Sequence, residues 1–448
     1  MSSEIEATAE TDFSGNRLRD IVRRNRASET VGVYAVCSAH PAVIAAAAQE
    51  ACENQSVLHV ESTSSQVNQF GGYTGQLPEQ FAAFVRDTAR KVGLNRQRIL
   101  LGGDHLGPFP WRREDSAIAM EKARALVRAC VLAGYQKIHL DASMACGDDP
   151  NPALDERTVA TRAADLCATA ERAFHELPPN SPPLLYVVGT EVPVPGGESH
   201  PEEAISITTP QHVKSTLDAF QRAFNGRGLE EAWDRVIGLV VQPGVEFGDA
   251  NIFEYDGAKA KALSAALPSH PQLVFEAHST DYQLPSSLKE MVEDHFAILK
   301  VGPWLTFAFR EAIFALAEIE TEMLSGKNRR TSKIREALEA AMLRNPDYWH
   351  DYYHGDEGEL RIARAFSYSD RCRYYWHEAE VRTEIELLLE NLTTYSPPLS
   401  LISQYLPQEY ERIRNKGLRP LPQEMVSNHI RRVLRKYAVA CGDNKAAA

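Results

Sequence analysis

The sequence predicts an α/β protein whose main part is a closed (β/α)8 TIM barrel, followed by a C-terminal helical subdomain. Eight short apolar segments with β-branched or aromatic residues recur between residues 31 and 304, and helical periodicity fills the chain between and after them. This alternation is typical of parallel strands joined by right-handed crossovers. The strands are apolar almost throughout, so both faces of the sheet are expected to be covered. Eight units in roughly 300 residues favour a barrel over the alternative, a doubly wound open sheet.

The expected strands and helices follow one another in chain order. The strands are expected at residues 31–38, 57–63, 98–105, 137–144, 184–192, 236–244, 272–280 and 296–304. The helices are expected at residues 41–54, 78–93, 115–134, 155–177, 210–226, 256–267, 286–295 and 307–324. Thr209 followed by Pro210 is typical of a helix N-cap and first turn, and Gly134 occurs where a helix is expected to stop.

The alternation of strands and helices ends near residue 325, which marks the expected domain boundary. After this point the chain is helical and dense in tyrosine and tryptophan, with the clearest helical segments at 334–343, 378–392 and 424–437. The aromatic residues are expected to form the core of a subdomain packed on the barrel. We therefore expect a disordered tail at 1–16, the barrel at 17–325, the helical subdomain at 326–440 and a tail at 441–448.

Composition disfavours several classes of protein. The chain has 448 residues and a formal net charge of −13, which argues against nonspecific binding to nucleic acid or to an anionic membrane. It shows neither a secretion signal nor an apolar run long enough to span a bilayer. Its seven cysteines are scattered without a Cys-x-x-Cys pair, so neither a disulfide framework nor a thiolate zinc site is expected. We expect a cytoplasmic protein with no nucleic-acid or membrane partner.

Polar side chains follow the apolar strands where the expected strands end. Catalytic groups of such barrels lie at the carboxyl ends of the strands, so these positions form the candidate site. The third strand ends in two glycines followed by Asp104 and His105, a carboxylate and a potential metal ligand. The other candidates are Glu61, Asn68 and Gln69 after the second strand, His139 and Asp141 in the fourth, Glu191 after the fifth, Gln242 after the sixth, and Glu276, His278 and Ser279 after the seventh.

Charged residues at so many strand ends indicate a polar site, because Asp, Glu and His are rarely buried unless they are paired or bound to metal. A single acid in such a place is explained as well by a helix cap or by a surface ion pair. His and Glu ligands suit a catalytic divalent ion such as zinc, and also manganese, cobalt or nickel. The chain contains neither a Walker loop nor a Rossmann fingerprint, which disfavours an ATP-dependent kinase and a nicotinamide oxidoreductase.

Several stretches of the chain resemble a known family. They lie at residues 37–41, 66–75, 102–108, 137–144, 189–198, 276–283, 369–371 and 402–407. On these motifs the chain is identified as a member of the family of tagatose-bisphosphate aldolase accessory (non-catalytic) subunits, also labelled tagatose-6-phosphate kinases. The family includes ketohexose(-phosphate) 4-epimerases. The resemblance covers about residues 18 to 440.

The family is in turn distantly similar to the class II, metal-dependent aldolases. Asp104 and His105 match the aldolase Asp-His pair, which supplies a catalytic acid and a metal ligand, and Glu191 precedes a matching Gly-Gly-Glu loop. The aldolase His-Gly after strand six has no counterpart here, because Gln242 begins a Gln-Pro-Gly stretch at that place. The resemblance implies a metal held by His105, Glu191 and His278. Its candidates for proton transfer are Asp104, Asp141 and Glu276.

Two functions follow from this resemblance. The first is metal-dependent epimerisation at carbon 4 of a D-tagatose/D-fructose type ketohexose or its 6-phosphate, by C3–C4 cleavage or by proton removal. The second is a non-catalytic accessory subunit that stabilises a class II tagatose-1,6-bisphosphate aldolase. Substrate contacts are expected from Glu61, Asn68, Gln69, Gln242 and Ser279, and a homo-oligomer is expected. A phosphate contact is expected from Arg371 or Arg373, with a surface ion pair as the alternative.

Overall fold

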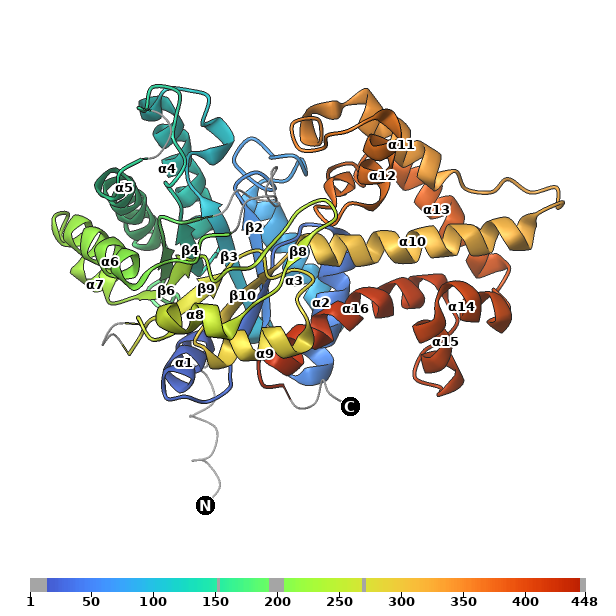
Figure 1. Cartoon of the computed structure of the whole chain (residues 1–448), viewed down its shortest axis with the longest axis horizontal. Helices are drawn as coiled ribbons and strands as arrows, with labels where there is room; N and C mark the ends of the chain where they lie inside the picture. Colours follow the sequence, from blue (N-terminus) through green and yellow to red (C-terminus); the bar gives the residue numbers. More distant parts are fainter. Residues whose placement is uncertain (1–13, 151–153, 193–204, 268–270, 444–448) are drawn as a thin grey trace, which may run out of the picture.

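The structure, a computed structural model, describes residues 14–150, 154–192, 205–267 and 271–443, and its centre is a closed barrel of eight parallel strands (Figure 1). The strands follow the ring order β1-β10-β9-β6-β5-β4-β3-β2. They are β1 (Val33–Val36), β2 (Leu58–Thr63), β3 (Ile99–Leu106), β4 (Lys137–Leu140), β5 (Leu185–Val188), β6 (Val236–Val241), β9 (Val274–Ala277) and β10 (Ile298–Val301). The expected barrel is confirmed over an open sheet, because β1 pairs with β10 and closes the ring. A short antiparallel hairpin, β7 (Glu246–Phe247) and β8 (Ile252–Phe253), follows β6 and was not expected.

Helices connect the strands and surround the barrel. They are α2 (Pro41–Asn54), α3 (Pro78–Lys91), α4 (Ser116–Leu132), α5 (Glu156–Phe174), α6 (Pro210–Asn225), α7 (Glu230–Trp233), α8 (Gly257–Ser264), α9 (Pro285–Glu293) and α10 (Pro303–Leu324). The expected N-cap is present, since the hydroxyl of Thr209 accepts the backbone N–H of His212 at 3.2 Å. None of the helices among the described residues has the length and apolarity that a membrane-crossing segment needs.

The amino ends of the strands are closed by α1 (Ser14–Arg26), which contacts β3 and β9. Leu18 and Val22 of this helix pack with Leu100, Leu185 and Ile237 in a separate apolar cluster inside the barrel. The first residues of α1 fall inside the expected tail 1–16, while residues 1–13 lie outside the described residues. Because α1 occupies the amino ends of the strands, the polar residues lie at the opposite, carboxyl ends, where the candidate site was expected.

The C-terminal helices gather on one side of the barrel, along the long helix α10 (Figure 1). They are α11 (Ile334–Arg344), α12 (Glu357–Phe366), α13 (Ala379–Thr394), α14 (Leu399–Tyr405), α15 (Pro407–Arg414) and α16 (Pro422–Ala440). The last of these returns to the barrel and packs against α2, α9 and α10. Residues 444–448 of the expected tail at 441–448 lie outside the described residues.

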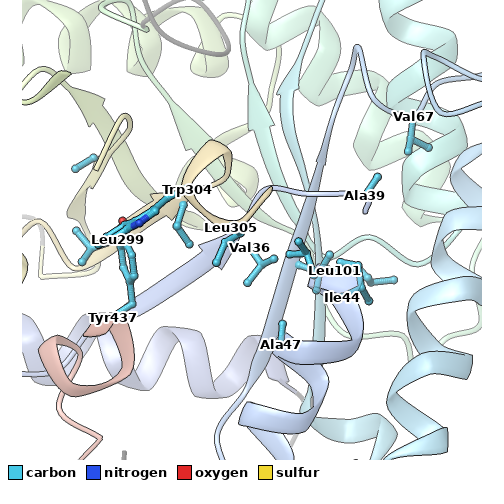
Figure 2. Packing of buried hydrophobic residues seen from close by; sticks show 14 of the residues in the cluster. Val36, Ala39, Ile44, Ala47, Val67, Leu101, Leu299, Trp304, Leu305 and Tyr437 are labelled. Atoms are coloured by element: carbon cyan, nitrogen blue, oxygen red, sulfur yellow. The ribbon is translucent and has the colours of Figure 1, made fainter. Parts of the chain in front are cut away.

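One apolar core runs from the barrel into the C-terminal helices. Figure 2 shows Val36 of β1, Leu299 of β10 and Tyr437 of α16 among these buried residues. The Tyr437 hydroxyl also donates a hydrogen bond of 2.7 Å to the carbonyl oxygen of Thr280, which follows β9. The ring of Trp304 in α10 lies 6.1 Å from that of Tyr437. The C-terminal helices are therefore tied to the barrel wall by both packing and hydrogen bonding.

The end of β3 departs from regular strand geometry. Between Gly103 and Leu106 the pairing with β4 shifts by one residue, and His105 in this bulge has φ +49°. Such a bulge redirects side chains locally. A Cβ on Gly107 would lie 1.6 Å from the carbonyl oxygen of Asp141, so only glycine fits this close approach. The bulge and this glycine bring the ends of β3 and β4 together at the site.

Candidate active site

A cavity of about 380 Å³ lies at the carboxyl ends of the barrel strands, and we call it the site cavity. One part of its lining follows the strands and consists of Cys37, Thr63, Asp104, His105, His278, Ser279, Asp281, Lys300 and Gly302. Another part comes from the C-terminal region and consists of Asp347, Tyr348, Tyr352, Arg371, Arg373 and Tyr374. The site is therefore built jointly by the barrel and by the segments before and after α12.

Two buried lysines cross-link three carboxylates beneath this cavity. The Nζ atom of Lys137 lies 2.7 Å from Glu61 and 2.6 Å from Glu276. The Nζ atom of Lys300 contacts Glu61, lies 2.8 Å from Asp104 and lies 3.6 Å from Glu276. These five side chains come from five strand segments, so ion pairs span the inside of the barrel. Burying them is tolerable only because each charge has partners of opposite sign.

The pairing controls the protonation of these groups. Burial by itself would raise the pKa values of Glu61 and Glu276, but the two lysine charges hold both well below their ordinary range. Burial disfavours the charged form of Lys300, yet the surrounding carboxylates raise its pKa well above the ordinary value. We therefore treat the carboxylates as ionised and the Lys300 amine as charged at neutral pH.

Three imidazoles, those of His105, His139 and His278, each lie next to at least one carboxylate. His139 Nδ1 lies 3.0 Å from Asp104, and His278 Nε2 lies 3.0 Å from Glu276. The ring centroids of His105, His139 and His278 form a triangle with sides of 5.0 to 5.3 Å. Burial lowers the pKa of His278 to about 4, so this imidazole is neutral at pH 7 and able to ligate a metal.

His105 and Asp141 form a pair of their own. The Nδ1 atom of His105 lies 2.8 Å from Asp141 Oδ2, while Asp141 Oδ1 accepts the backbone N–H and the hydroxyl of Ser143 at 3.0 and 2.6 Å. Burial opposes ionisation of Asp141, but these hydrogen bonds and the His105 imidazole hold its pKa below the ordinary range. Burial likewise opposes protonation of His105, and the charges of Asp104 and Asp141 outweigh it and raise the pKa of His105. This pair is suited to holding and releasing a proton.

One group of side chains fits a metal ion. Ligand atoms of Asp104, His139, Glu276 and His278 all lie within 4.8 Å of one another. The Nε2 atom of His139 is buried and has no hydrogen-bond partner among the described residues. Together with Glu61 and Asp141, which lie outside this metal-ligand group, the carboxylates number four against two lysines, an excess of two formal negative charges before the imidazoles are counted. Imidazole and carboxylate donors with this excess charge fit a divalent cation.

Two of the expected metal ligands take other positions. His105 contacts Asp104 and Asp141 beside the metal-ligand group. Glu191 accepts a hydrogen bond from the hydroxyl of Thr208 and lies 3.8 Å from His212, and it does not line the site cavity. The Gly-Gly-Glu loop expected after Glu191 lies outside the described residues.

The amides expected to contact substrate make hydrogen bonds within and between loops. Asn68 Oδ1 accepts the backbone N–H groups of Phe70 and Gly72 at 2.9 and 3.1 Å, and the Asn68 side chain lines the site cavity. Gln69 donates a hydrogen bond of 3.0 Å to the carbonyl oxygen of Lys122. Gln242 Oε1 accepts the backbone N–H groups two and three residues later, at 2.8 and 3.0 Å. Of the three, only Asn68 faces the site.

Ser279, Arg371 and Arg373 all line the site cavity. Arg371 donates to the carbonyl oxygen of Tyr348 at 2.9 Å. The guanidinium of Arg373 donates to backbone carbonyl oxygens within its own turn and to the hydroxyl of Tyr374 at 2.8 Å. Two cationic groups are thus held at the cavity wall opposite the strand ends.

Reasoning from strand ends gave no role to the two lysines. Lys300 stands inside an otherwise apolar strand segment, which is the signal that marks it, whereas Lys137 is the first residue of β4. Lys137 and His139 are two residues apart on β4 and therefore point to the same side, into the barrel. A buried lysine requires an ionised partner, so its presence in a strand predicts a carboxylate on a facing strand.

Replacing Lys300 by methionine should destabilise the protein by about 3 kcal/mol at about pH 8. Without this charge, burial raises the pKa values of Glu61, Asp104 and Glu276 in the folded variant above those in the unfolded chain. The folded variant then binds protons more readily than the unfolded chain, so the loss of unfolding free energy becomes smaller as the pH falls towards about 5. Urea unfolding of the variant and the wild type at both pH values measures the difference. The control Lys289→Met removes an exposed lysine paired with Glu293 and should cost less than about 1 kcal/mol at either pH. A pH-independent loss in Lys300→Met would contradict the charge assignment.

Comparison with known proteins agrees with the resemblance seen in the motifs. The model of the family described as D-tagatose-1,6-bisphosphate aldolase subunit GatZ/KbaZ-like matches residues 18–442. The chain is similar to the crystal structure of a probable tagatose 6 phosphate kinase from Sinorhizobium meliloti 1021, with 43% identity, a TM-score of 0.84, and coverage of 92% of this chain and 100% of that one.

Two more distant matches are the fructuronate-tagaturonate epimerase UxaE from Cohnella laeviribosi and the fructose-bisphosphate aldolase from Campylobacter jejuni. Their identities are 12% and 16%, and their TM-scores are 0.45 and 0.39. The epimerase match covers 91% of this chain and 81% of that one, and the aldolase match covers 85% and 93%. A likeness of this degree assigns no reaction. The family match spans nearly the whole chain, and the protein belongs to the D-tagatose-1,6-bisphosphate aldolase subunit GatZ/KbaZ-like family.

Proposed function

We propose that this protein catalyses metal-dependent epimerisation at carbon 4 of a ketohexose or ketohexose 6-phosphate of the D-tagatose/D-fructose type. The observation that carries the proposal is the cluster of Asp104, His139, Glu276 and His278 beside an open cavity. Tagatose enters from the family description and from the name of the similar Sinorhizobium meliloti protein. We place the activity in the cytoplasm, in line with seven cysteines that lie in the described residues as free thiols.

The metal in this proposal is a divalent ion, with zinc as our choice and manganese, cobalt or nickel as alternatives. When bound, it would act as a Lewis acid on the ketone and a neighbouring hydroxyl of the sugar. Asp104, Glu276, His139 and His278 would hold it, although the resemblance to aldolases had suggested His105 and Glu191. The His105–Asp141 pair is then left to handle protons next to the metal.

We favour a route that breaks and re-forms the bond between carbons 3 and 4. The aldehyde fragment turns over before it re-adds, so carbon 4 changes configuration while keeping its hydrogen. In this route the His105–Asp141 pair takes the 4-hydroxyl proton and returns it, with no net change in protonation. Direct removal of the carbon-4 hydrogen is less favourable, because that hydrogen is not adjacent to the ketone.

The far wall of the site cavity suits a phosphate group. Arg371 and Arg373 line it together with Tyr348 and Tyr374. Arginine makes bidentate contacts with phosphate oxygens. We infer that a 6-phosphate lies at this wall, which places the reacting end of the sugar towards the strand ends.

A second candidate function is an accessory subunit that binds a catalytic aldolase subunit, and the family description favours it by naming an aldolase subunit. A site without catalytic duty tolerates the loss of charged groups. The buried cluster here retains four carboxylates, two lysines and four imidazoles, the fourth being His59 at 2.6 Å from Glu61. This favours catalysis. The kinase activity named for the Sinorhizobium meliloti protein stays disfavoured, since the sequence lacks a nucleotide-binding loop motif.

The direct test of the function is incubation of the purified protein with fructose 6-phosphate and with tagatose 6-phosphate, with no other protein present. We expect interconversion that stops on chelation of the metal. The variant His278→Gln should lose bound metal and lower turnover by more than about 100-fold, since even residues that only support ligands cost about 10–100-fold. Elemental analysis of the variant gives a readout independent of activity.

The control for this variant is His175→Gln, an exposed histidine on the barrel surface, which should keep metal and turnover. Metal content unchanged in His278→Gln would remove His278 from the ligand set. A metal-loaded wild type without turnover, but with tight binding to an aldolase subunit, would favour the accessory function instead.

Turnover in deuterated water separates the two routes at carbon 4. The cleavage route predicts product with protium at carbon 4, because that hydrogen never leaves its carbon. Mass spectrometry and proton NMR of the product report the label at this position. Deuterium at carbon 4 would show that the hydrogen itself is removed and would exclude C3–C4 cleavage.

The phosphate contact is tested with Arg371→Ala and Arg371→Lys. We expect KM for tagatose 6-phosphate to rise by about tenfold or more in Arg371→Ala, because a charge-assisted contact is lost, and to recover in part in Arg371→Lys. KM for free tagatose serves as the control in the same protein and should change little. An equal rise for both sugars would place the effect in packing rather than in phosphate binding.

A further inference from the structure

Asp281 lines the site cavity and has no part in the reaction described above. It follows β9 and is 3% exposed. Its Oδ1 atom accepts the backbone N–H groups of Gly302 and Trp304 at 3.0 and 2.8 Å, where α10 begins. These two bonds satisfy backbone donors at the start of a helix, so one oxygen of the carboxylate has a structural role.

The other oxygen, Oδ2, is available to a ligand. It makes no hydrogen bond with any of the described residues. Unlike the unpaired side-chain atoms elsewhere in the protein that are shut off from solvent, it keeps accessible surface in the cavity. The two bonds to Oδ1 fix the plane of the carboxylate, and they therefore fix the position of Oδ2 as well. A preorganised acceptor of this kind suits a hydrogen-bond donor on the substrate.

The backbone around Asp281 has an unusual conformation. Ser279 and Tyr282, on either side of it, have φ +53° and φ +66°, in the left-handed region that residues other than glycine rarely adopt. The turn is held by the hydroxyl of Thr280, which donates to the carbonyl oxygen of Lys300 at 2.6 Å. Strained backbone of this kind collects at functional sites, where the surrounding structure maintains it.

The protonation of Asp281 suits an acceptor. Burial raises its pKa to about 6, although the two backbone N–H groups and the charge of Arg373 act in the opposite direction. The nearby hydroxyls of Tyr282 and Tyr437 stay neutral, since burial raises their pKa values well above the ordinary range. At about pH 8 the carboxylate is therefore ionised, and an ionised carboxylate only accepts hydrogen bonds.

Asp281 stands between the two ends of the proposed substrate site. His278 of the metal-ligand group precedes it in the same segment, and Arg373 of the far wall is near enough for its charge to act on it. In the proposed function, carbon 4 reacts beside the metal and the 6-phosphate lies at the arginines. The carbon-5 hydroxyl is the hydroxyl of the substrate that lies between these two points.

We propose that Asp281 Oδ2 accepts a hydrogen bond from the carbon-5 hydroxyl of the sugar phosphate and thereby selects the substrate. The inference rests on the proposed function for the direction in which the sugar lies. A sugar without a hydroxyl at this place leaves a buried carboxylate oxygen unpaired, which disfavours binding.

Binding of D-glucitol 6-phosphate and of its 5-deoxy analogue to the purified protein at about pH 8 tests the proposal. Neither probe has a carbonyl group, so neither reacts, and the two differ only in the carbon-5 hydroxyl. Calorimetry should show that the wild type binds the analogue about tenfold or more weakly, because a hydrogen bond to a charged group is lost.

Asp281→Asn separates the ligand contact from the structural role. The side-chain oxygen of the asparagine still accepts both N–H groups of α10, while the charge and the acceptor at Oδ2 are lost. This variant should bind D-glucitol 6-phosphate about fivefold or more weakly and should bind the 5-deoxy analogue as the wild type does. Asp218→Asn replaces an exposed aspartate on α6 and is the matched control, which should bind both probes normally.

The proposal is overturned if the wild type binds both probes equally tightly, if Asp281→Asn weakens both by the same factor, or if neither probe binds. Failure of the proposed function gives a different result, namely no interconversion of fructose 6-phosphate and tagatose 6-phosphate. A wild type without this turnover whose preference for the carbon-5 hydroxyl falls in Asp281→Asn supports the contact, because the binding measurement is independent of the reaction.

Discussion

The structure depends on the ion pairs that Lys137 and Lys300 make with Glu61, Asp104 and Glu276 inside the barrel. A TIM barrel is normally filled by layers of apolar side chains, so ionised groups in its interior carry a large desolvation cost. Here the apolar filling occupies the amino end, where Leu18 and Val22 of α1 pack inside the strands. The polar layer lies above it. This division places an apolar core at one end of the eight strands and the polar candidate site at the other.

Fixed charges beneath the site also orient the groups that face the cavity. Asp104 contacts both Lys300 and His139, and Glu276 contacts both lysines and His278. Each carboxylate therefore has a lysine on one side and an imidazole on the other, which limits the directions in which its oxygens can point. Such second contacts set the geometry and basicity of metal ligands in proteins. The same contacts keep the carboxylates ionised without solvent.

The C-terminal region completes the site from the other side. Asp370 is buried in an ion pair with Arg310 of α10 at 3.0 Å, and it also accepts the hydroxyl of Thr306 at 2.6 Å. These buried contacts of Asp370 hold the turn that carries Arg371 and Arg373. The ring of Tyr374 in the same turn lies 4.7 Å from Tyr73 of a barrel loop. Because barrel and helices share these contacts, both parts of the chain hold the cavity wall opposite the strand ends.

The sequence by itself determined the elements and most of the strand-end chemistry. Apolar runs alternating with helical periodicity were enough to predict the eight strands, because a parallel strand buried on both faces is apolar over most of its length. The closeness of Asp104, His105, Asp141, Glu276 and His278 followed from the same logic, since parallel strands bring their carboxyl ends to one rim. Only the tertiary structure decided how these groups pair. The bulge after Gly103 decides whether His139 or His105 joins the metal-ligand group. Local backbone turns decide that Glu191 and Gln242 form hydrogen bonds with neighbouring loop atoms. The lysine pairs join strands far apart in the chain, and periodicity within one strand carries no information about the strand that faces it across the barrel.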